Sequence, residues 1–311
     1  MKQQINIICS TDEKYVHNTG VMLTSLCEHN RNVRIFIVVS HTFKSTYKTK
    51  FYKLANKYQV ELNFVSIDLD LLASCPTIEN MSLATYYKIF AAHLVDTESK
   101  VIYLDSDIII NGSLQELWET DMTDYAFAGV QDLYHQDRTT YDRLQYPMEL
   151  GYYNAGMMIF NLDYWRQHNV LKQCLTYIAD NRERILWCEQ DVLNALFFDR
   201  KKNLPLKFNY QIAMLLRCFY ESFSVDFQKC IMDVTKPIVI HYVGTDKPWM
   251  IDFYRHPFEK EWQKYKRMSL WRYKLPLFPK TNRLKTILKR YILWPLGWKR
   301  SNPYILIKEK L

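Results

Sequence analysis

The stretch VIYLDSDIII, Val101–Ile110, is apolar except around Asp105 and Asp107. Its composition predicts a buried strand that ends near the two aspartates. Buried carboxylates need a partner, and two that lie close together repel each other. One interpretation is an Asp-rich turn whose side chains cap backbone N–H groups. The other is a divalent cation, because residues i and i+2 of a strand face the same side and carboxylate oxygens suit Mg²⁺ and Mn²⁺.

The segments around this stretch alternate between strand and helix patterns. Apolar runs predict strands over residues 4–9, 33–40, 61–68, 101–110, 125–130, 155–162 and 238–244. Apolar residues at helical spacing predict helices over residues 19–29, 46–58, 82–94, 171–182 and 189–198. This alternation predicts an α/β fold with a mixed, mostly parallel sheet and helices on both faces. Ligands of such sheets bind beyond the carboxyl ends of the strands, where Asp105, Asp107, Ser10, Thr11 and Asp12 fall.

The composition favours a folded globular protein, since 48% of the 311 residues are hydrophobic and 24% are charged. Seven cysteines without close spacing argue against a zinc cluster and against a disulfide framework. The first apolar run is too short for a signal peptide, and no stretch approaches the roughly 18 apolar residues of a spanning helix. We therefore expect a cytoplasmic protein. The common glycine-rich phosphate-binding loops are absent from the sequence.

The charge is unevenly distributed along the chain. Residues 263–311 contain 14 Lys and Arg and one acidic residue, so they carry +13, whereas the net charge of the whole chain is +8. This shift predicts two parts, a catalytic domain over 1–262 and a basic tail over 263–311. An apolar helical face in the tail, with tryptophans nearby, predicts attachment to an anionic membrane surface. The residues concerned are Leu284, Ile287, Leu288, Tyr291, Ile292, Trp271, Trp294 and Trp298. The alternatives are packing against the body and nucleic-acid binding, although no nucleic-acid module is visible.

A second candidate segment is HYVGTDKPW, His241–Trp249. His241 ends a predicted strand and would suit a third metal ligand, although an isolated histidine there is often a core residue. Gly244 lets the backbone approach a ligand closely. Lys247 would pair with a phosphate as a point charge.

Two further segments contain polar residues beside predicted elements. Asn154, in YYNAGMMIFNL, either binds a hydroxyl-rich ligand or is an ordinary turn residue. In WCEQDVLNALF, Glu189, Gln190 and Asp191 open a predicted helix, where acidic residues complement the helix dipole. The functional alternative is that Glu189 and Gln190 face a reaction centre.

Together these segments resemble the family 8 retaining glycosyltransferases, which include bacterial lipopolysaccharide galactosyl- and glucosyltransferases and glycogenin. YLDSD, NAGMMIFNL, EQDVLN and HYVGTDKPW occur in the order and at roughly the spacing of that family. The resemblance extends from the first strand to about Trp249. It implies a Rossmann-like nucleotide-sugar-binding fold of GT-A type. It also implies Mn²⁺-dependent transfer, or transfer with Mg²⁺, from a UDP-sugar with retention at the anomeric carbon.

The resemblance assigns roles to individual residues. Asp105, Asp107 and His241 look like the metal ligands. The positions similar to those that hold the UDP-sugar are Ser10, Thr11, Asp12, Tyr15, Lys88, Ser106, Asn154, Ala155, Gly244 and Lys247. Glu189, Gln190 and Asp132 look like residues around the sugar and the acceptor, and we expect them to be catalytic. Many members have Asp-Gln in place of Glu189-Gln190, which leaves the donor sugar open between galactose and glucose.

A metal ion and a lysine would stabilise the negative charge that develops on the leaving diphosphate. Retention by two displacements would need a nucleophile, and only Gln190 or Glu189 is offered, so front-face attack is favoured. We expect a hexosyltransferase on the cytoplasmic face of the inner membrane, acting on a lipid-linked glycan such as lipopolysaccharide core. The alternatives are a glycosyltransferase acting on a protein or a soluble glycan, a non-catalytic nucleotide- or glycan-binding protein, and a membrane-surface adaptor.

Overall fold

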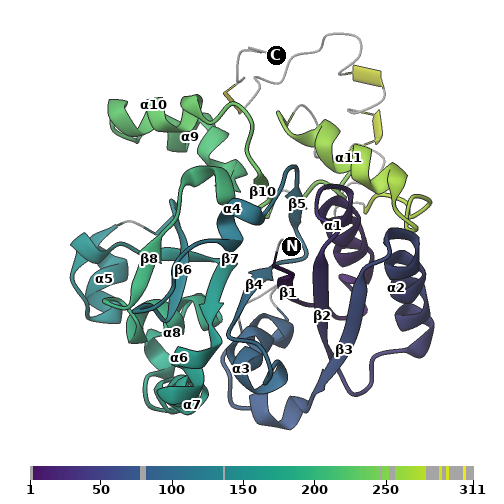
Figure 1. Cartoon of the computed structure of the whole chain (residues 1–311). Coiled ribbons are helices and arrows are strands. Elements are labelled where there is room, and N and C mark those ends of the chain that lie inside the picture. The colour runs from purple at the N-terminus through teal and green to yellow at the C-terminus, as the bar shows by residue number, and fades with distance from the viewer. Residues whose placement is uncertain are drawn as a thin grey trace.

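A central seven-stranded sheet organises the chain in the computed structural model (Figure 1). The model describes residues 3–77, 82–135, 137–245, 247–251, 256–277, 287–288, 292–293 and 304–305. The strand order is β3-β2-β1-β4-β7-β6-β8. Their bounds are Ile5–Ser10 (β1), Val33–Ser40 (β2), Glu61–Ile67 (β3), Lys100–Leu104 (β4), Phe127–Gln131 (β6), Tyr153–Asn161 (β7) and Lys201–Asn203 (β8). Only β7 runs antiparallel to its neighbours β4 and β6, so the predicted mixed, mostly parallel sheet is confirmed.

A second, three-stranded sheet corrects the prediction for Val101–Ile110. Its strands are Ile108–Ile110 (β5), Val239–His241 (β10) and Tyr210–Gln211 (β9), in the order β5-β10-β9. The single predicted strand is wrong, because β4 pairs with β1 and β7 whereas β5 pairs antiparallel with β10. Asp105 and Asp107 therefore lie in the turn where the chain leaves one sheet for the other.

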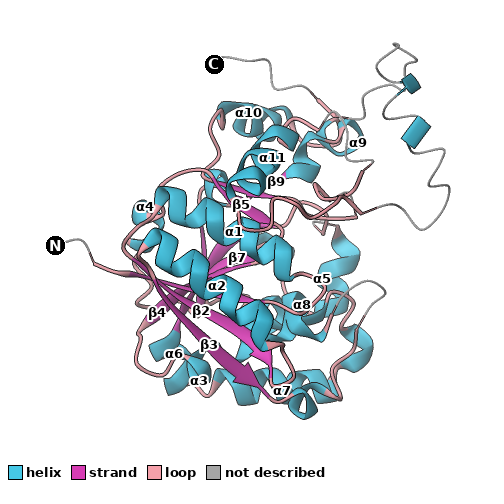
Figure 2. Ribbon diagram, turned by 90° about the vertical axis from the view of Figure 1, so that its right-hand side faces the viewer, coloured by secondary structure: helices cyan, strands magenta, loops and turns pink. Residues whose placement is uncertain are grey.

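Helices cover both faces of the large sheet (Figure 2). One layer contains Val16–His29 (α1) and Ser45–Tyr58 (α2), and the opposite layer contains Ala91–Leu94 (α3), Leu162–Gln167 (α6), Val170–Asp180 (α7) and Cys188–Leu196 (α8). Ile7 and Ile8 of β1 are fully buried in these two different layers, as the alternation of side chains along a strand requires. The predicted helix over 82–94 is instead a 3-10 helix, Leu83–Phe90, followed by α3.

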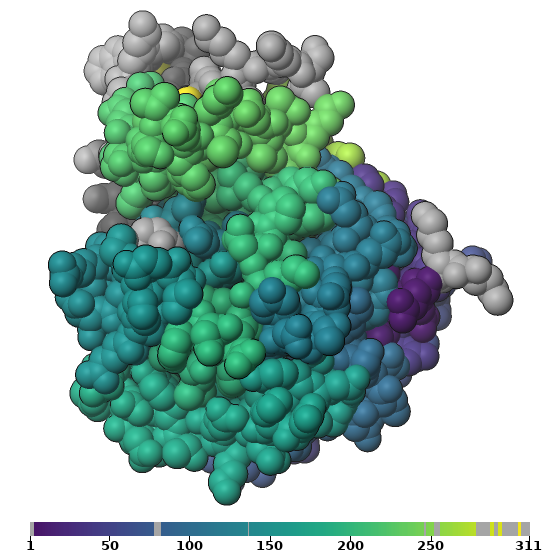
Figure 3. Space-filling view, turned by 60° about the vertical axis from the view of Figure 1, so that its left-hand side comes forward, coloured from purple at the N-terminus to yellow at the C-terminus, as the bar shows by residue number. Residues whose placement is uncertain are grey.

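The chain also forms short elements that the sequence did not predict. The helices are Gln115–Trp118 (α4), Arg138–Leu144 (α5), Arg217–Tyr220 (α9), Val225–Asp233 (α10) and Glu259–Met268 (α11). Further 3-10 turns are Leu69–Leu72, Met148–Leu150, Arg182–Arg184, Leu206–Phe208 and Ile212–Leu215. In Figure 3 the light green α9–α10 segment lies as an upper layer above the teal surface of the sheet domain.

The structured body continues beyond the expected boundary at residue 262. Helix α11 crosses that position, and Trp271 is only 6% exposed. The centroids of its indole and of the Phe51 ring are 5.0 Å apart. A Cβ on Gly20 would lie 2.3 Å from carbons of the same indole, so only glycine fits at position 20. Leu277 forms a bridge with Met250, which leaves the residues after 277 for any separate tail.

The predicted amphipathic helix of the tail lies largely outside the described residues, as do Trp294 and Trp298. Its described residues include Leu288 and Ile292, which are 44% and 49% exposed. Further on, Tyr304 pairs with Leu216, back against the body. Among the described residues, no helix is both long and apolar enough to span a bilayer.

Candidate active site

Three candidate metal ligands converge where the two sheets meet. Asp105 and Asp107 occupy the turn between β4 and β5, and His241 is the last residue of β10. Because β10 pairs with β5 in a register that sets His241 opposite Ile108, the imidazole lies beside Asp107. One ligand atom from each residue lies within 4.8 Å of the other two. The aspartates thus converge through a turn, and not through the common face of a strand that the sequence suggested.

The donor set fits a hard divalent cation. Two carboxylates and one imidazole are ligands that suit Mn²⁺, and Mg²⁺ prefers the oxygens. Asp107 Oδ1 lies 3.2 Å from His241 Nε2, and Asp107 Oδ2 lies 2.5 Å from Lys247 Nζ. Burial raises the pKa of Asp107, but the Lys247 ammonium and the contact with His241 outweigh it and hold the pKa well below the usual range. Asp107 is therefore an ionised ligand.

Asp105 is held from the other side of the turn. Tyr103 Oη donates a hydrogen bond of 2.7 Å to Asp105 Oδ1, and Lys88 Nζ lies 3.5 Å from the same oxygen. Ser10 Oγ lies 3.0 Å from Tyr103 Oη, which connects the loop after β1 to the acidic pair. These contacts fix one carboxylate oxygen and leave the other for a cation.

Lys88 and Glu189 form a buried ion pair behind the acidic turn. Their side chains are 1% and 3% exposed, and Lys88 Nζ lies 2.6 Å from Glu189 Oε1. Thr85 Oγ1 donates to Glu189 Oε2 at 2.6 Å. Thr85 and Lys88 are three residues apart in the 3-10 helix, a spacing that places both side chains on one side. Both oxygens of Glu189 are therefore engaged.

The pKa values of this pair follow from burial and mutual attraction. Burial would lower the pKa of Lys88, but the charges of Asp105 and Glu189 outweigh it and raise that pKa above its ordinary value. Burial raises the pKa of Glu189, and the Lys88 ammonium partly offsets this shift. The lysine is thus charged, and its charge faces the acidic turn.

A second cluster gathers Gln190, Asn154 and Asp132. Gln190 Oε1 accepts the Ala155 N–H at 2.8 Å, and its amino group donates to Asp132 Oδ2 at 3.1 Å. Asn154 Nδ2 donates to the same oxygen at 2.9 Å. Asp132 is 3% exposed, and its Oδ1 accepts the Tyr134 N–H at 2.8 Å. The structure therefore gathers these predicted site residues but places Asp132 beneath the surface.

The loop after β1 borders the acidic turn. Asp12 Oδ1 accepts the Tyr15 N–H at 2.9 Å. Thr11 is buried, and its Oγ1 accepts a hydrogen bond of 2.8 Å from Thr19 Oγ1. The pKa of Tyr15 is raised by burial and then by the charges of Asp107, Asp12 and Asp105. Ser106 lies in the turn between the two aspartates.

Gly244 lies three residues after His241. It adopts φ +84°, a conformation that glycine tolerates, and Tyr134 Oη lies 3.4 Å from where its Cβ would be. Sequence reasoning missed Thr85, Tyr103, Tyr134 and Asn209, which all contact the predicted residues. Thr85, Tyr103 and Tyr134 had a usable signal, because each lies two or three residues from a predicted site residue.

The fold is of the GT-A class, as the resemblance predicted, and it carries an acidic pair and a histidine at this edge of the sheet. The chain belongs to glycosyl transferase family 8, whose sequence profile matches residues 6–252. It is therefore a hexosyltransferase of a retaining family, as the resemblance predicted.

Comparison with known proteins supports this assignment. The chain is 24% identical over 274 residues to general stress protein A of Bacillus subtilis, covering 86% of this chain and 94% of that protein. It is 27% identical over 250 residues to a lipopolysaccharide 1,2-glucosyltransferase of Escherichia coli K12, covering 79% and 72%. The crystal structure of galactosyltransferase LgtC with donor and acceptor sugar analogs matches with a TM-score of 0.78 at 21% identity, covering 86% of this chain and 96% of that one. This match shows that the two proteins share a fold.

Proposed function

We propose that the protein transfers galactose or glucose from a UDP-sugar to a lipid-linked glycan, such as lipopolysaccharide core, using Mn²⁺. The observation that carries this proposal is the convergence of Asp105, Asp107 and His241 within 4.8 Å, beside Lys247, at the edge where such sheets bind ligands. Asp105, Asp107 and His241 would hold the ion, which would supply charge stabilisation for the leaving diphosphate. The names of the lipopolysaccharide glucosyl- and galactosyltransferase relatives support the acceptor class.

Lys247 and Lys88 would have different electrostatic roles in the site. Lys247 is 19% exposed and pairs with Asp107 at its Nζ, so it can turn to a phosphate that enters the site. Lys88 is enclosed by Asp105, Glu189 and the Ala155 carbonyl, so it stays in place. We assign Lys247 to the donor diphosphate, and we assign Lys88 to a fixed positive charge beside Asp105.

The contacts of Glu189 and Gln190 support front-face attack. Both oxygens of Glu189 are engaged by Lys88 and Thr85, and the Gln190 amide is engaged by Ala155 and Asp132. Neither side chain is therefore free to attack the anomeric carbon as the nucleophile of a double displacement. In front-face attack the bond from the anomeric carbon to the phosphate oxygen breaks, and its electron pair leaves with UDP. The acceptor hydroxyl bonds to that carbon on the same face, and its proton passes to the departing diphosphate.

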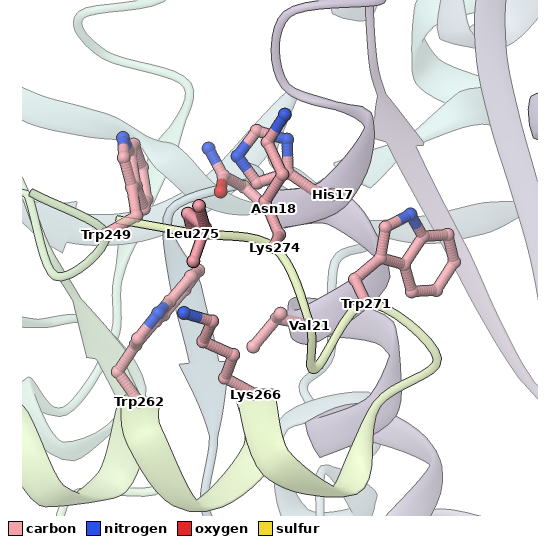
Figure 4. A pocket seen from close by; sticks show the side chains of 9 residues that line it. All are labelled: His17, Asn18, Val21, Trp249, Trp262, Lys266, Trp271, Lys274 and Leu275. Carbon is pink, nitrogen blue, oxygen red and sulfur yellow. The ribbon is translucent and has the colours of Figure 1, made fainter. Parts of the chain in front are cut away.

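We also propose that the basic C-terminal part holds the enzyme on the cytoplasmic face of an anionic membrane. Tyr273 and Leu275 are 81% and 78% exposed, and they alternate with Arg272 and Lys274. The buried indoles of Trp249, Trp262 and Trp271 line a small pocket together with Lys274 and Leu275 (Figure 4). Exposed apolar side chains beside cations are typical of segments that lie in a membrane interface.

The test is release of UDP from UDP-galactose and from UDP-glucose, each measured with Mn²⁺ and with EDTA. We expect slow, Mn²⁺-dependent hydrolysis of one donor even without an acceptor. Equal rates with Mn²⁺ and EDTA would refute the metal assignment. A protein that binds neither UDP nor Mn²⁺ would refute the proposed donor site as a whole.

A further inference from the structure

A line of buried polar side chains leads from Asp132 to His241. Asn154 Nδ2 donates to Asp132 Oδ2 at 2.9 Å, and Asn209 Nδ2 donates to Asn154 Oδ1 at 2.9 Å. Asn209 Oδ1 lies 3.0 Å from His241 Nδ1. None of the four residues in this line is more than 6% exposed, and Asn209 is fully buried. The line therefore lies within the protein, with only its histidine end facing the acidic turn.

The direction of these hydrogen bonds is fixed by a backbone group. The Gly156 N–H lies 3.0 Å from Asn154 Oδ1, and because a backbone N–H can only donate, that atom must be the amide oxygen. The Asn154 oxygen must then accept from the amino group of Asn209. Asn209 in turn presents its own oxygen to His241, so the proton of the neutral imidazole lies on Nδ1.

This arrangement leaves the Nε2 lone pair of His241 directed at Asp107 Oδ1, 3.2 Å away. Two acceptors at that distance repel each other unless a proton or a cation lies close to both. We propose that Asn209 is a positioning residue that holds His241 as the Nδ1–H tautomer, so that Nε2 is available to a divalent cation. The inference rests on the metal site of the proposed function. Partners of this kind orient ligating histidines and raise their affinity for the metal.

The first experiment measures Mn²⁺ affinity by the EPR signal of free Mn²⁺ in the presence of UDP. Asn209→Leu removes the acceptor and should weaken Mn²⁺ binding by about 10- to 100-fold. Asn209→Asp should keep wild-type affinity, because its carboxylate still accepts the Nδ1–H, although its second oxygen opposes the Asn154 oxygen and lowers stability. Asn30→Leu is the matched control, since Asn30 is another buried asparagine, bonded to Leu26, Gly112 and Leu114. It should lower the melting temperature and leave Mn²⁺ affinity unchanged.

A double-mutant cycle shows whether Asn209 acts through the histidine. In a His241→Ala background, Asn209→Leu should cause no further loss of Mn²⁺ affinity. An equal loss in both backgrounds, or equal losses for the Leu and Asp variants, would overturn the inference. A wild-type protein that fails to bind Mn²⁺ would instead overturn the metal site itself.

A measurement on the wild-type chain removes any dependence on folding of the variants. ¹⁵N spectra of the histidine rings, recorded with Mg²⁺ and UDP, distinguish the two tautomers of His241. We expect the proton on Nδ1 with Nε2 facing the ion. A proton on Nε2 in the loaded protein would contradict the role assigned to Asn209.

Discussion

A single methyl group at Gly156 should disable the proposed metal site. A Cβ on Gly156 would lie 2.1 Å from His241 Cε1, 2.8 Å from Nε2 and 2.9 Å from Nδ1. Carbon atoms in contact normally stay about 3.5–4.0 Å apart, so in Gly156→Ala the imidazole must retreat by more than about 1 Å. The backbone of Gly156 has an ordinary φ, so the expected effect comes from the collision alone.

The size of the effect follows from that displacement. The retreat would lengthen the 3.0 Å contact with Asn209 and would carry Nε2 away from Asp107. A misplacement of about 1 Å at a reacting centre costs on the order of 100-fold in rate. We therefore expect Mn²⁺-dependent UDP release to fall by about 100-fold, with a parallel loss of Mn²⁺ affinity in the EPR titration.

Gly129→Ala is the matched control for this substitution. Gly129 lies on β6, opposite Met158 of β7, and its added Cβ would meet Tyr153 Cδ1 at an ordinary 3.6 Å. It should leave both UDP release and Mn²⁺ affinity near wild type. If Gly156→Ala also keeps wild-type Mn²⁺ affinity while folding normally, the packing of His241 on Gly156 is not what positions the ligand.

Four further changes test other parts of the proposal. Asp105→Asn and Asp107→Asn should each abolish Mn²⁺-stimulated UDP release, and wild-type turnover in either variant would exclude the metal assignment. Lys88→Met leaves the Glu189 carboxylate buried without its cation, so unfolding in urea should show a loss of about 3–5 kcal/mol. Lys207→Met, which breaks the exposed pair with Glu116, should change stability by less than about 1 kcal/mol, and equal losses would contradict the buried-pair argument. A chain ending at Leu277 should be released from anionic vesicles in a sedimentation assay and should still hydrolyse the donor. Unchanged vesicle binding would exclude the tail as the anchor. Leu277 is chosen as the end because a chain ending at Trp262 would also lack the buried residues Tyr265 and Trp271.

The elements with local signals were predicted well from the sequence. The continuous apolar run of β2 was predicted with its bounds, Val33–Ser40, and the helical periodicity of α2 placed it within one residue. The stretch Val101–Ile110 failed because its two halves pair with strands from different sheets. Pairing of that kind depends on β10, which lies more than 100 residues further along the chain, and no local pattern reports it.

The candidate site shows the same division between local and distant information. Asp105, Asp107 and His241 were found because each follows or ends an apolar run, and such positions gather at one edge of a sheet. Asn209 carries no such signal, since it lies between Phe208 and Tyr210 in a short irregular segment. It reaches His241 only because β9 pairs with β10, with Gln211 opposite His241.

The contacts of Asp132 connect the proposed metal site to the proposed sugar site. Its Oδ2 accepts from both Asn154 and Gln190, and each of these amides is oriented by its own backbone donor, the N–H of Gly156 and that of Ala155. One branch continues to His241, and the other ends at Gln190. A carboxylate is required at the junction, because an acceptor-only group can receive both amino groups and the Tyr134 N–H together, whereas an amide would turn a donor toward at least one of them. Asp132→Asn should therefore weaken Mn²⁺ binding and disturb the Gln190 position at once, although neither function requires Asp132 to touch the substrate.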